Sequence, residues 1–163
     1  MNIFYLHWNP FTCATMHNDK HCVKMILETA QILSTVHHHY DTAISRYSDI
    51  YKPTHKHHPS TKWAMETDRN YKWLWELLYW LCKEYTYRYG KIHKVERTGL
   101  LDTLHLVPCT IPIGLFTDPP QAMPDDCKIV NNSIEAYRKY YMQYKNHISK
   151  WTNRDIPEWF IAA

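Results

Sequence analysis

The chain has 163 residues, of which 45% are hydrophobic and 21% charged. This length fits one domain whose core needs no disulfide or metal, and the composition is ordinary for a globular protein. The 3 glycines form no glycine-rich run, which excludes phosphate loops of the Walker and dinucleotide-binding kinds. The net charge of +3 with neutral histidines is a mild cationic bias that permits nucleic-acid binding.

The cysteine pattern and the hydropathy predict where the protein works. Five cysteines, an odd number without a CxxC pair, indicate reduced thiols rather than a disulfide framework or a zinc finger. No signal peptide opens the sequence, and no apolar stretch approaches the roughly 18 residues of a membrane span. We therefore expect a cytoplasmic protein with no membrane partner.

The first third of the chain predicts one amphipathic helix. Residues 2–8 form a short apolar run, either a strand or a buried N-terminal arm. The helix is expected to start at Asn18 or Asp19, both good N-caps. Its predicted buried stripe consists of Val23, Ile26, Leu27, Ala30, Leu33 and Tyr40. The predicted opposite face carries His17, His21, Lys24, Glu28, Gln31 and Thr35 within an arc of about 80°.

The remaining segments alternate between predicted helices and loops. Five of the nine prolines lie in 107–132, which predicts a long irregular loop. We expect a loop at 41–59, a helical region at 60–89, a short helix at 91–106 and a last helix at 133–151. Within the region 60–89, Thr67-Asp68 is expected to act as a second N-cap, and Gly90 is expected to end the helix. The tail should dock Trp159 and Phe160 on the core. The predicted class is all-α, with 1–163 forming one domain.

Lys24 and Glu28 form the pair with the clearest chemical potential. An amine and a carboxylate four residues apart on a helix can act together as nucleophile and acid/base group. The same spacing also fits a surface ion pair that contributes a few tenths of a kcal/mol, about 0.2–0.5. Spacing alone favours the ion pair.

Two histidine clusters, His37 to His39 and His55 to His58, raise the question of a metal. Consecutive residues on a helix point about 100° apart, so the first cluster cannot place three imidazoles on one ion. The loop cluster could supply two ligands, but no HExxH motif is present. We assign no metal site and no cofactor. A metal-dependent hydrolase that uses His55, His57 or His58 with His17 or His21 is kept as an alternative.

Aromatic residues are unusually frequent, with 13 Tyr and 7 Trp. Those between Trp63 and Tyr89 circle their helix, so some belong to the core. Exposed rings beside basic residues suit stacking on bases near phosphates. An aromatic core with basic side chains at its rim fits equally well. The basic residues concerned are Lys62, Arg69, Lys72 and Arg88.

The segment 19–33, DKHCVKMILETAQIL, resembles the first long helix of a known enzyme family. The family is the pyrimidine-dimer DNA glycosylases of the phage endonuclease V type, and the likeness lies in Asp19, His21 and Glu28. The segment 58–91 is similar to that family's second long helix, and YRKYY and PEWF are similar to its C-terminal part. The segment 17–37 also resembles uncharacterised small proteins of tailed phages.

The resemblance implies an all-α domain that binds duplex DNA, flips a nucleotide and cleaves the glycosidic bond. It implies that Glu28 stabilises the sugar intermediate and that the α-amino group at the processed Met1 end is the nucleophile. As our own hypothesis, Lys24 supplies this amine from the same helix face. His21 and His58 would position or protonate the substrate. The nucleic-acid-binding residues would be Lys20, Gln31, Lys62, Arg69 and Lys72.

Two departures from the family pattern affect the chemistry. Leu27 and Gln31 stand where the family has two arginines beside its glutamate. Asn2 is expected to hinder removal of Met1, which would move the amine by about one residue, roughly 3.8 Å. The loss of the arginines favours a second hypothesis, a nucleic-acid- or nucleotide-binding phage protein on the same fold without glycosylase chemistry, related to host defence or modified bases.

Overall fold

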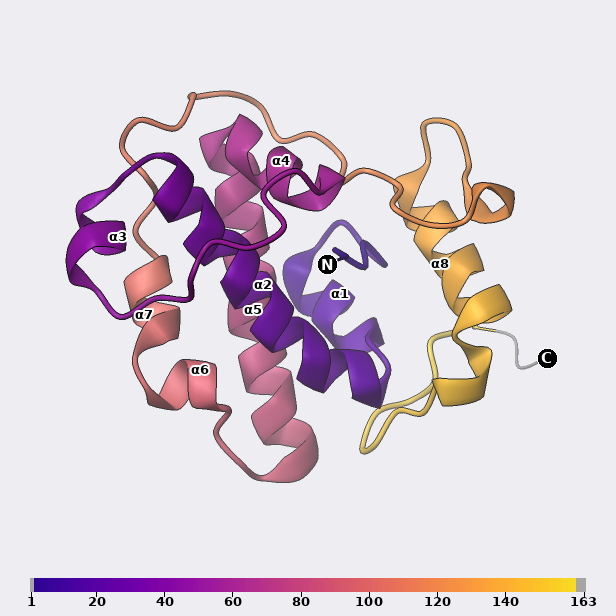
Figure 1. The fold of residues 1–163 in the computed structure, drawn as a ribbon. Helices are drawn as coiled ribbons and strands as arrows, with labels where there is room; N and C mark the ends of the chain where they lie inside the picture. The colour runs from indigo at the N-terminus through magenta and orange to yellow at the C-terminus, as the bar shows by residue number, and fades with distance from the viewer. Residues whose placement is uncertain (1, 161–163) are drawn as a thin grey trace.

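Helices are the only regular structure in the computed structural model, which describes residues 2–160 (Figure 1). The α-helices are α1 (Pro10–Met16), α2 (Asp19–His39), α3 (Ala43–Tyr47), α4 (Pro59–Glu66), α5 (Asp68–Tyr89), α6 (Lys94–Arg97), α7 (Leu100–Leu104) and α8 (Ser133–Tyr144). Short 3-10 helices lie at Asp125–Cys127 and Asn146–Ile148. The predicted all-α class is confirmed.

Local capping explains where the two long helices begin and end. The Asn18 side chain accepts a hydrogen bond from the His21 N–H at 2.8 Å and so caps α2. The Thr67 hydroxyl accepts from the Asn70 N–H at 3.1 Å, which starts α5 at the predicted division. Gly90 ends α5 with a φ of +64°, a left-handed conformation that glycine adopts without strain.

The long helices α2 and α5 cross at the centre of the molecule and bury their apolar sides together (Figure 1). Ile26 and Leu33 of α2 and Leu74 and Leu78 of α5 are completely buried in this contact layer. Each such side chain contributes about 1.5–3 kcal/mol by leaving water. Helix α1 packs on α5, and α4 packs on α2.

Residues 2–8 form an arm, not a strand, and the buried part of this arm joins α8 to the rest of the molecule. Ile3 to Leu6 are all buried. The Phe4 ring meets the rings of Tyr137 and Tyr141 edge-on. The Arg138 side chain donates from Nε to the Leu6 carbonyl at 3.0 Å.

Four boundaries differ from the predicted ones. The Asn9 side chain caps α1 with Pro10 in its first turn, a helix signal that the sequence reading passed over. The expected loop 41–59 contains α3, and Gly99, with a φ of +82°, divides 91–106 into two short helices. The last helix ends at Tyr144, and the chain turns back so that the Trp151 indole donates to the Met16 carbonyl at 2.9 Å.

The predicted buried stripe of α2 is wrong at two positions. Val23 and Leu27 are each 40% exposed. Their places are taken by Cys22 and Met25, which are buried. The second half of α2 is buried nearly all round, because other elements cover both of its sides. Thr35, which was expected on the outward face, is therefore buried, and so are His17 and His21 at the start of the helix.

The C-terminal segment docks as predicted. Trp151 is buried, and Trp159 and Phe160 are packed against the core. Among residues 2–160, no helix combines the length and the apolar character needed to cross a bilayer.

Candidate functional site

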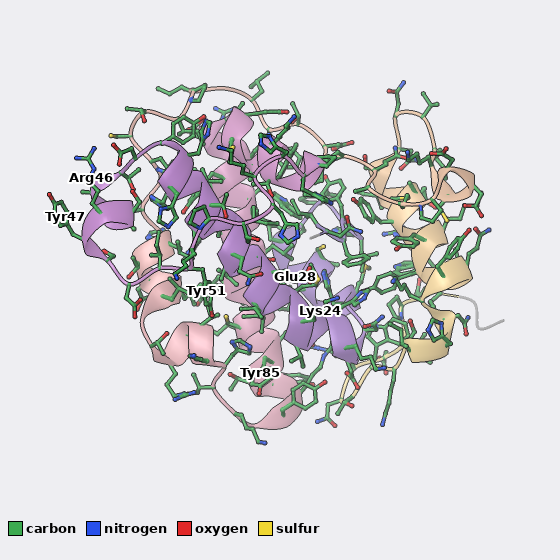
Figure 2. The ribbon with its side chains drawn as sticks, in the orientation of Figure 1. Lys24, Glu28, Arg46, Tyr47, Tyr51 and Tyr85 are labelled. Carbon is green, nitrogen blue, oxygen red and sulfur yellow. The ribbon has the colours of Figure 1, made fainter. Side chains whose placement is uncertain are left out.

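The outward face of α2 carries the Lys24–Glu28 pair (Figure 2). The distance from Lys24 Nζ to Glu28 Oε1 is 3.5 Å. The Lys24 side chain is 67% exposed, whereas that of Glu28 is only 16% exposed. The carboxylate is therefore recessed, and the amine extends from the same helix turn into solvent. Lys20 lies exposed one turn earlier, and Gln31 is half-buried one turn later.

His58 is brought near Glu28 although 30 residues separate them. The imidazole caps α4, with Nδ1 accepting a hydrogen bond from the Ser60 N–H at 3.1 Å. Because Nδ1 is an acceptor, the ring proton of the neutral imidazole lies on Nε2. Burial lowers the pKa of His58, His55 adds to this effect, and the negative charge of Glu28 acts against it. The ring proton of His58 thus lies on the nitrogen that does not cap α4.

His21 is part of the packing under this face. Its ring stacks on Phe4 with the centroids 4.1 Å apart, and its Nδ1 lies 2.7 Å from the Tyr141 hydroxyl. Burial lowers the pKa of His21 to about 3, with smaller contributions from nearby positive groups. The imidazole is thus neutral at pH 7. The expectation that His21 lies on the exposed face is corrected, because the N-terminal arm and α8 cover it.

A buried charge network holds the first turn of α2. The Asp19 carboxylate accepts from the Thr152 N–H at 2.9 Å and from Arg88 Nη1 at 3.1 Å. The Arg88 side chain is completely buried and also donates from Nε to Glu84 at 2.9 Å. Arg154 completes the network with two hydrogen bonds to the Glu84 carboxylate at 2.8 and 2.9 Å. Every charge has a partner of opposite sign, which satisfies the requirement for burying such groups.

The predicted nucleic-acid-binding residues outside α2 have different surroundings. Lys62 and Arg69 are exposed. Lys72 Nζ is 3.1 Å from Asp68 Oδ2, so its charge is partly neutralised. Arg88, which was grouped with exposed aromatic residues, is instead buried in the network with Asp19.

The aromatic residues of α4 and α5 belong mainly to the core. Trp63, Tyr71 and Trp73 are buried, and both indoles donate to backbone carbonyls, of Thr117 and Trp8 respectively. These rings are unavailable for stacking on bases.

The predicted nucleophile at Met1 lies outside the described residues. In the part of the arm that follows, the Asn2 side chain donates to the Ala122 carbonyl at 2.9 Å. The arm then passes along α2, where Phe4 covers His21.

The histidine clusters have separate surroundings. His37 is buried between the hydroxyls of Thr42 and Tyr71, at 2.9 Å from each. His38 bonds to the Tyr51 carbonyl at 3.0 Å. Within residues 2–160, no three His, Cys, Asp or Glu side chains are grouped so as to hold a metal ion. The metal-dependent hydrolase thus lacks a ligand set in this range.

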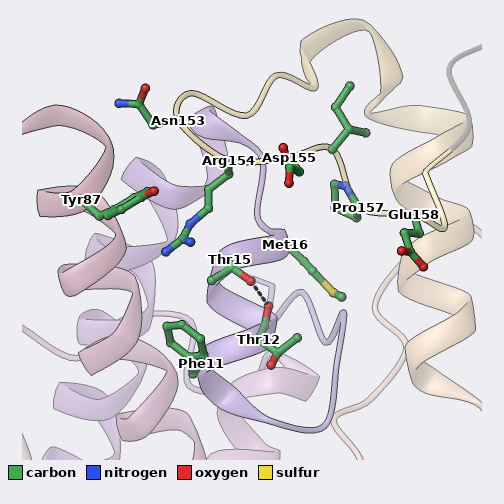
Figure 3. Close-up of a pocket in the computed structure, with 11 residues that line it drawn as sticks. Phe11, Thr12, Thr15, Met16, Tyr87, Asn153, Arg154, Asp155, Pro157 and Glu158 are labelled. Atoms are coloured by element: carbon green, nitrogen blue, oxygen red, sulfur yellow. Dashed lines mark hydrogen bonds between the residues drawn. The ribbon is translucent and has the colours of Figure 1, made fainter.

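A cavity of about 810 Å³ lies away from Glu28, between α1, the end of α5 and the C-terminal segment (Figure 3). Phe11 and Tyr87 form part of its wall. The Arg154 guanidinium lies 4.0 Å from the centre of the Tyr87 ring and is already paired with Glu84. With its one arginine neutralised, this cavity is poorly suited to phosphate. The α2 face fits the predicted chemistry better.

Sequence reasoning did not find Phe4 and Tyr141 as the residues that cover His21. Tyr141 lies 120 positions from His21, and no local pattern links them. Comparison with known proteins adds no relative: no family model matches the chain, and neither a curated protein nor a solved structure gives a significant match.

Proposed function

We propose that the protein is a DNA glycosylase with AP-lyase activity that works through an amine Schiff base. The observation that supports this most is the recessed Glu28 carboxylate 3.5 Å from the Lys24 amine on an open helix face. A partly buried carboxylate on such a face can stabilise a positive sugar intermediate. His58, which caps the neighbouring helix, is the candidate to donate a hydrogen bond from Nε2 to the leaving base.

In the proposed reaction, an amine attacks C1′ of the damaged nucleotide. The new N–C1′ bond replaces the glycosidic bond, and the base leaves with a proton. The ring then opens to an iminium, and loss of the C2′ proton expels the 3′ phosphate. Water finally hydrolyses the imine and releases the amine. The candidate amines are the N-terminal group at Met1 and Lys24, and Glu28 stabilises the cationic intermediates.

Borohydride trapping on a duplex with one abasic site tests this proposal. We expect a covalent adduct with the wild-type protein and its loss in Glu28→Gln. Loss on chemical blocking of the N-terminus assigns the amine to the chain end, whereas loss in Lys24→Ala assigns it to the helix. Lys91→Ala, an exposed lysine beyond α5, is the matched control and should trap normally. If the wild type gives neither a covalent adduct nor strand cleavage, the proposed glycosylase and lyase activity is refuted.

One observation favours a second candidate, a nucleic-acid- or nucleotide-binding protein without this chemistry. Leu27, 40% exposed, and Gln31 stand beside Glu28 and provide no positive charge to hold a phosphate at the reacting nucleotide. The same trapping experiment decides: DNA binding without an adduct supports this candidate.

A further inference from the structure

The segment between α3 and α4 crosses α2 on the side of the Lys24–Glu28 pair (Figures 1 and 2). We call residues 51–58 the crossing loop. No acidic residue occurs from Tyr51 to Met65, and the next one is Glu66. The ionisable groups of the crossing loop, Tyr51 apart, are Lys52, His55, Lys56, His57 and His58. The predicted nucleic-acid-binding set contains neither lysine of this loop.

The crossing loop is attached firmly to α2. The Thr54 N–H donates to the Thr35 hydroxyl at 3.1 Å. That hydroxyl donates to the Gln31 carbonyl at 2.8 Å and also lies 3.2 Å from the Thr54 carbonyl. One turn further along α2, His38 Nε2 bonds to the Tyr51 carbonyl at 3.0 Å. A loop that is already ordered loses little conformational entropy when it binds a partner.

The tip of the crossing loop presents its charges outward. The His58 N–H donates to the His55 carbonyl at 3.0 Å and closes a turn that has Lys56 and His57 at its exposed tip. Lys52 is also exposed, before the turn. Among the described residues, neither lysine of the loop is within ion-pair distance of a carboxylate. Their charges are therefore available to an external anion.

The position of the loop relative to Glu28 gives it a role. Thr35 is seven residues beyond Glu28, about 10 Å along the helix axis, and Lys20 is about 12 Å in the other direction. Lys20 and the attachment of the crossing loop at Thr35 thus lie on opposite sides of Glu28, about 22 Å apart along the helix axis. This length corresponds to six or seven base-pair steps of a duplex at a rise of about 3.4 Å.

We propose that the crossing loop is a phosphate-binding wall of the DNA site, in which Lys52 and Lys56 contact the nucleic-acid backbone on the far side of Glu28 from Lys20 and Lys24. The occupant is nucleic acid rather than an acidic protein, because residues 52–58 expose lysines and histidines but contain no Trp, Tyr, Phe or large aliphatic side chain. Protein interfaces place such apolar groups at their centre. The inference rests on the proposed DNA substrate.

Fluorescence anisotropy with a labelled, undamaged duplex tests this wall across a series of salt concentrations. The variant Lys52→Gln/Lys56→Gln removes two exposed charges. Each lost phosphate contact should lower the magnitude of the slope of log K against log salt by about 0.9, so the slope of the double variant should be smaller by about 1.8. At 0.1 M salt this variant should bind the duplex at least about tenfold more weakly than the wild type. Lys91→Gln/Lys94→Gln removes the same charge from exposed positions at α6 and just before it.

A smaller slope in the loop variant alone supports the wall. Equal changes in the two double variants would show an effect of net charge and overturn it, as would a loop variant that binds like the wild type. The proposed chemistry is judged separately by borohydride trapping. A wild type that traps while the loop variant keeps its slope refutes the wall alone, and a reduced slope without trapping refutes the chemistry alone. A wild type that does not bind the duplex overturns the wall and the DNA substrate together.

Discussion

Arg88 Nη1 and Asp19 Oδ1 lie 3.1 Å apart and join the last turn of α5 to the first turn of α2. The Arg88 side chain is completely buried, and that of Asp19 is 17% exposed. This contact fixes one end of the helix that presents Lys24 and Glu28, about two turns further on. The orientation of the candidate site thus depends on a pair of charges that does not belong to it.

Arg88→Met should be strongly destabilising. It leaves the carboxylates of Asp19 and Glu84 without their shared partner, and breaking such a buried network costs about 3–5 kcal/mol. Urea unfolding measures the difference. The control Lys128→Met removes an exposed pair with Asp125 and should change the free energy of unfolding by no more than about 0.5 kcal/mol. Equal small effects for both would show that the buried network contributes no stability.

Acid should destabilise the protein below about pH 6.5. Burial lowers the pKa of His17 and His37 to about 4 and that of His21 to about 3. In the unfolded chain these imidazoles titrate near their ordinary value, about 6.5. Between about pH 6.5 and 4 the unfolded state therefore binds more protons, so stability is complete above pH 6.5 and falls as the pH decreases.

Each of these imidazoles contributes at most about 1.4 kcal/mol per pH unit. Urea unfolding at pH 7, 5.5 and 4.5 measures the decline. His37→Gln retains a hydrogen-bonding side chain but cannot titrate, so its decline should be shallower than that of the wild type. An unchanged slope would mean that His37 takes up a proton equally well in both states.

Thr35→Val should loosen the crossing loop without unfolding the protein. The substitution keeps the shape of the side chain but removes the acceptor of the Thr54 N–H, a loss of about 1 kcal/mol because water can reach the half-buried Thr54 backbone. Hydrogen exchange should accelerate at the Thr54 amide. Thr98→Val, which removes an exposed hydroxyl contact with Lys94, should leave exchange at Thr54 as it is. A Thr54 amide that exchanges at the wild-type rate would contradict the attachment.

Two neighbouring residues of α2 should respond very differently to substitution. Leu27→Lys should change the free energy of unfolding by less than about 0.5 kcal/mol, because Leu27 is 40% exposed. Ile26→Ala should cost about 2–5 kcal/mol, since Ile26 is completely buried. Thermal or urea unfolding of the two variants provides the comparison. A large loss of stability in Leu27→Lys would show that Leu27 is buried, as helical periodicity predicts.

Features that depend on neighbouring residues could be predicted from the sequence. Asn18, Thr67 and Gly90 mark helix ends by capping, which acts within one turn. The outward position of Lys24 and Glu28 also follows from helical spacing. These interactions are local, so a single sequence displays them.

The covering of α2 could not be predicted in the same way. Val23 is exposed and His21 is buried because the N-terminal arm and α8 pack on one side of the helix only. Tyr141, which bonds to His21, is 120 positions away, and periodicity does not indicate which side of a helix such a segment covers. The approach of His58 to Glu28 depends in the same way on how α4 packs on α2.

The contact between Asp19 and Thr152 spans 133 positions of the chain and has a consequence for biosynthesis. The first turn of α2 leaves the ribosome long before Thr152, so its carboxylate acquires the Thr152 N–H and hydroxyl only after the 132 intervening residues have also emerged. Such long-range closure comes late in folding, because it must overcome the entropy of a large loop. The nascent protein therefore carries α2 with an incomplete first turn until Thr152 has left the ribosome.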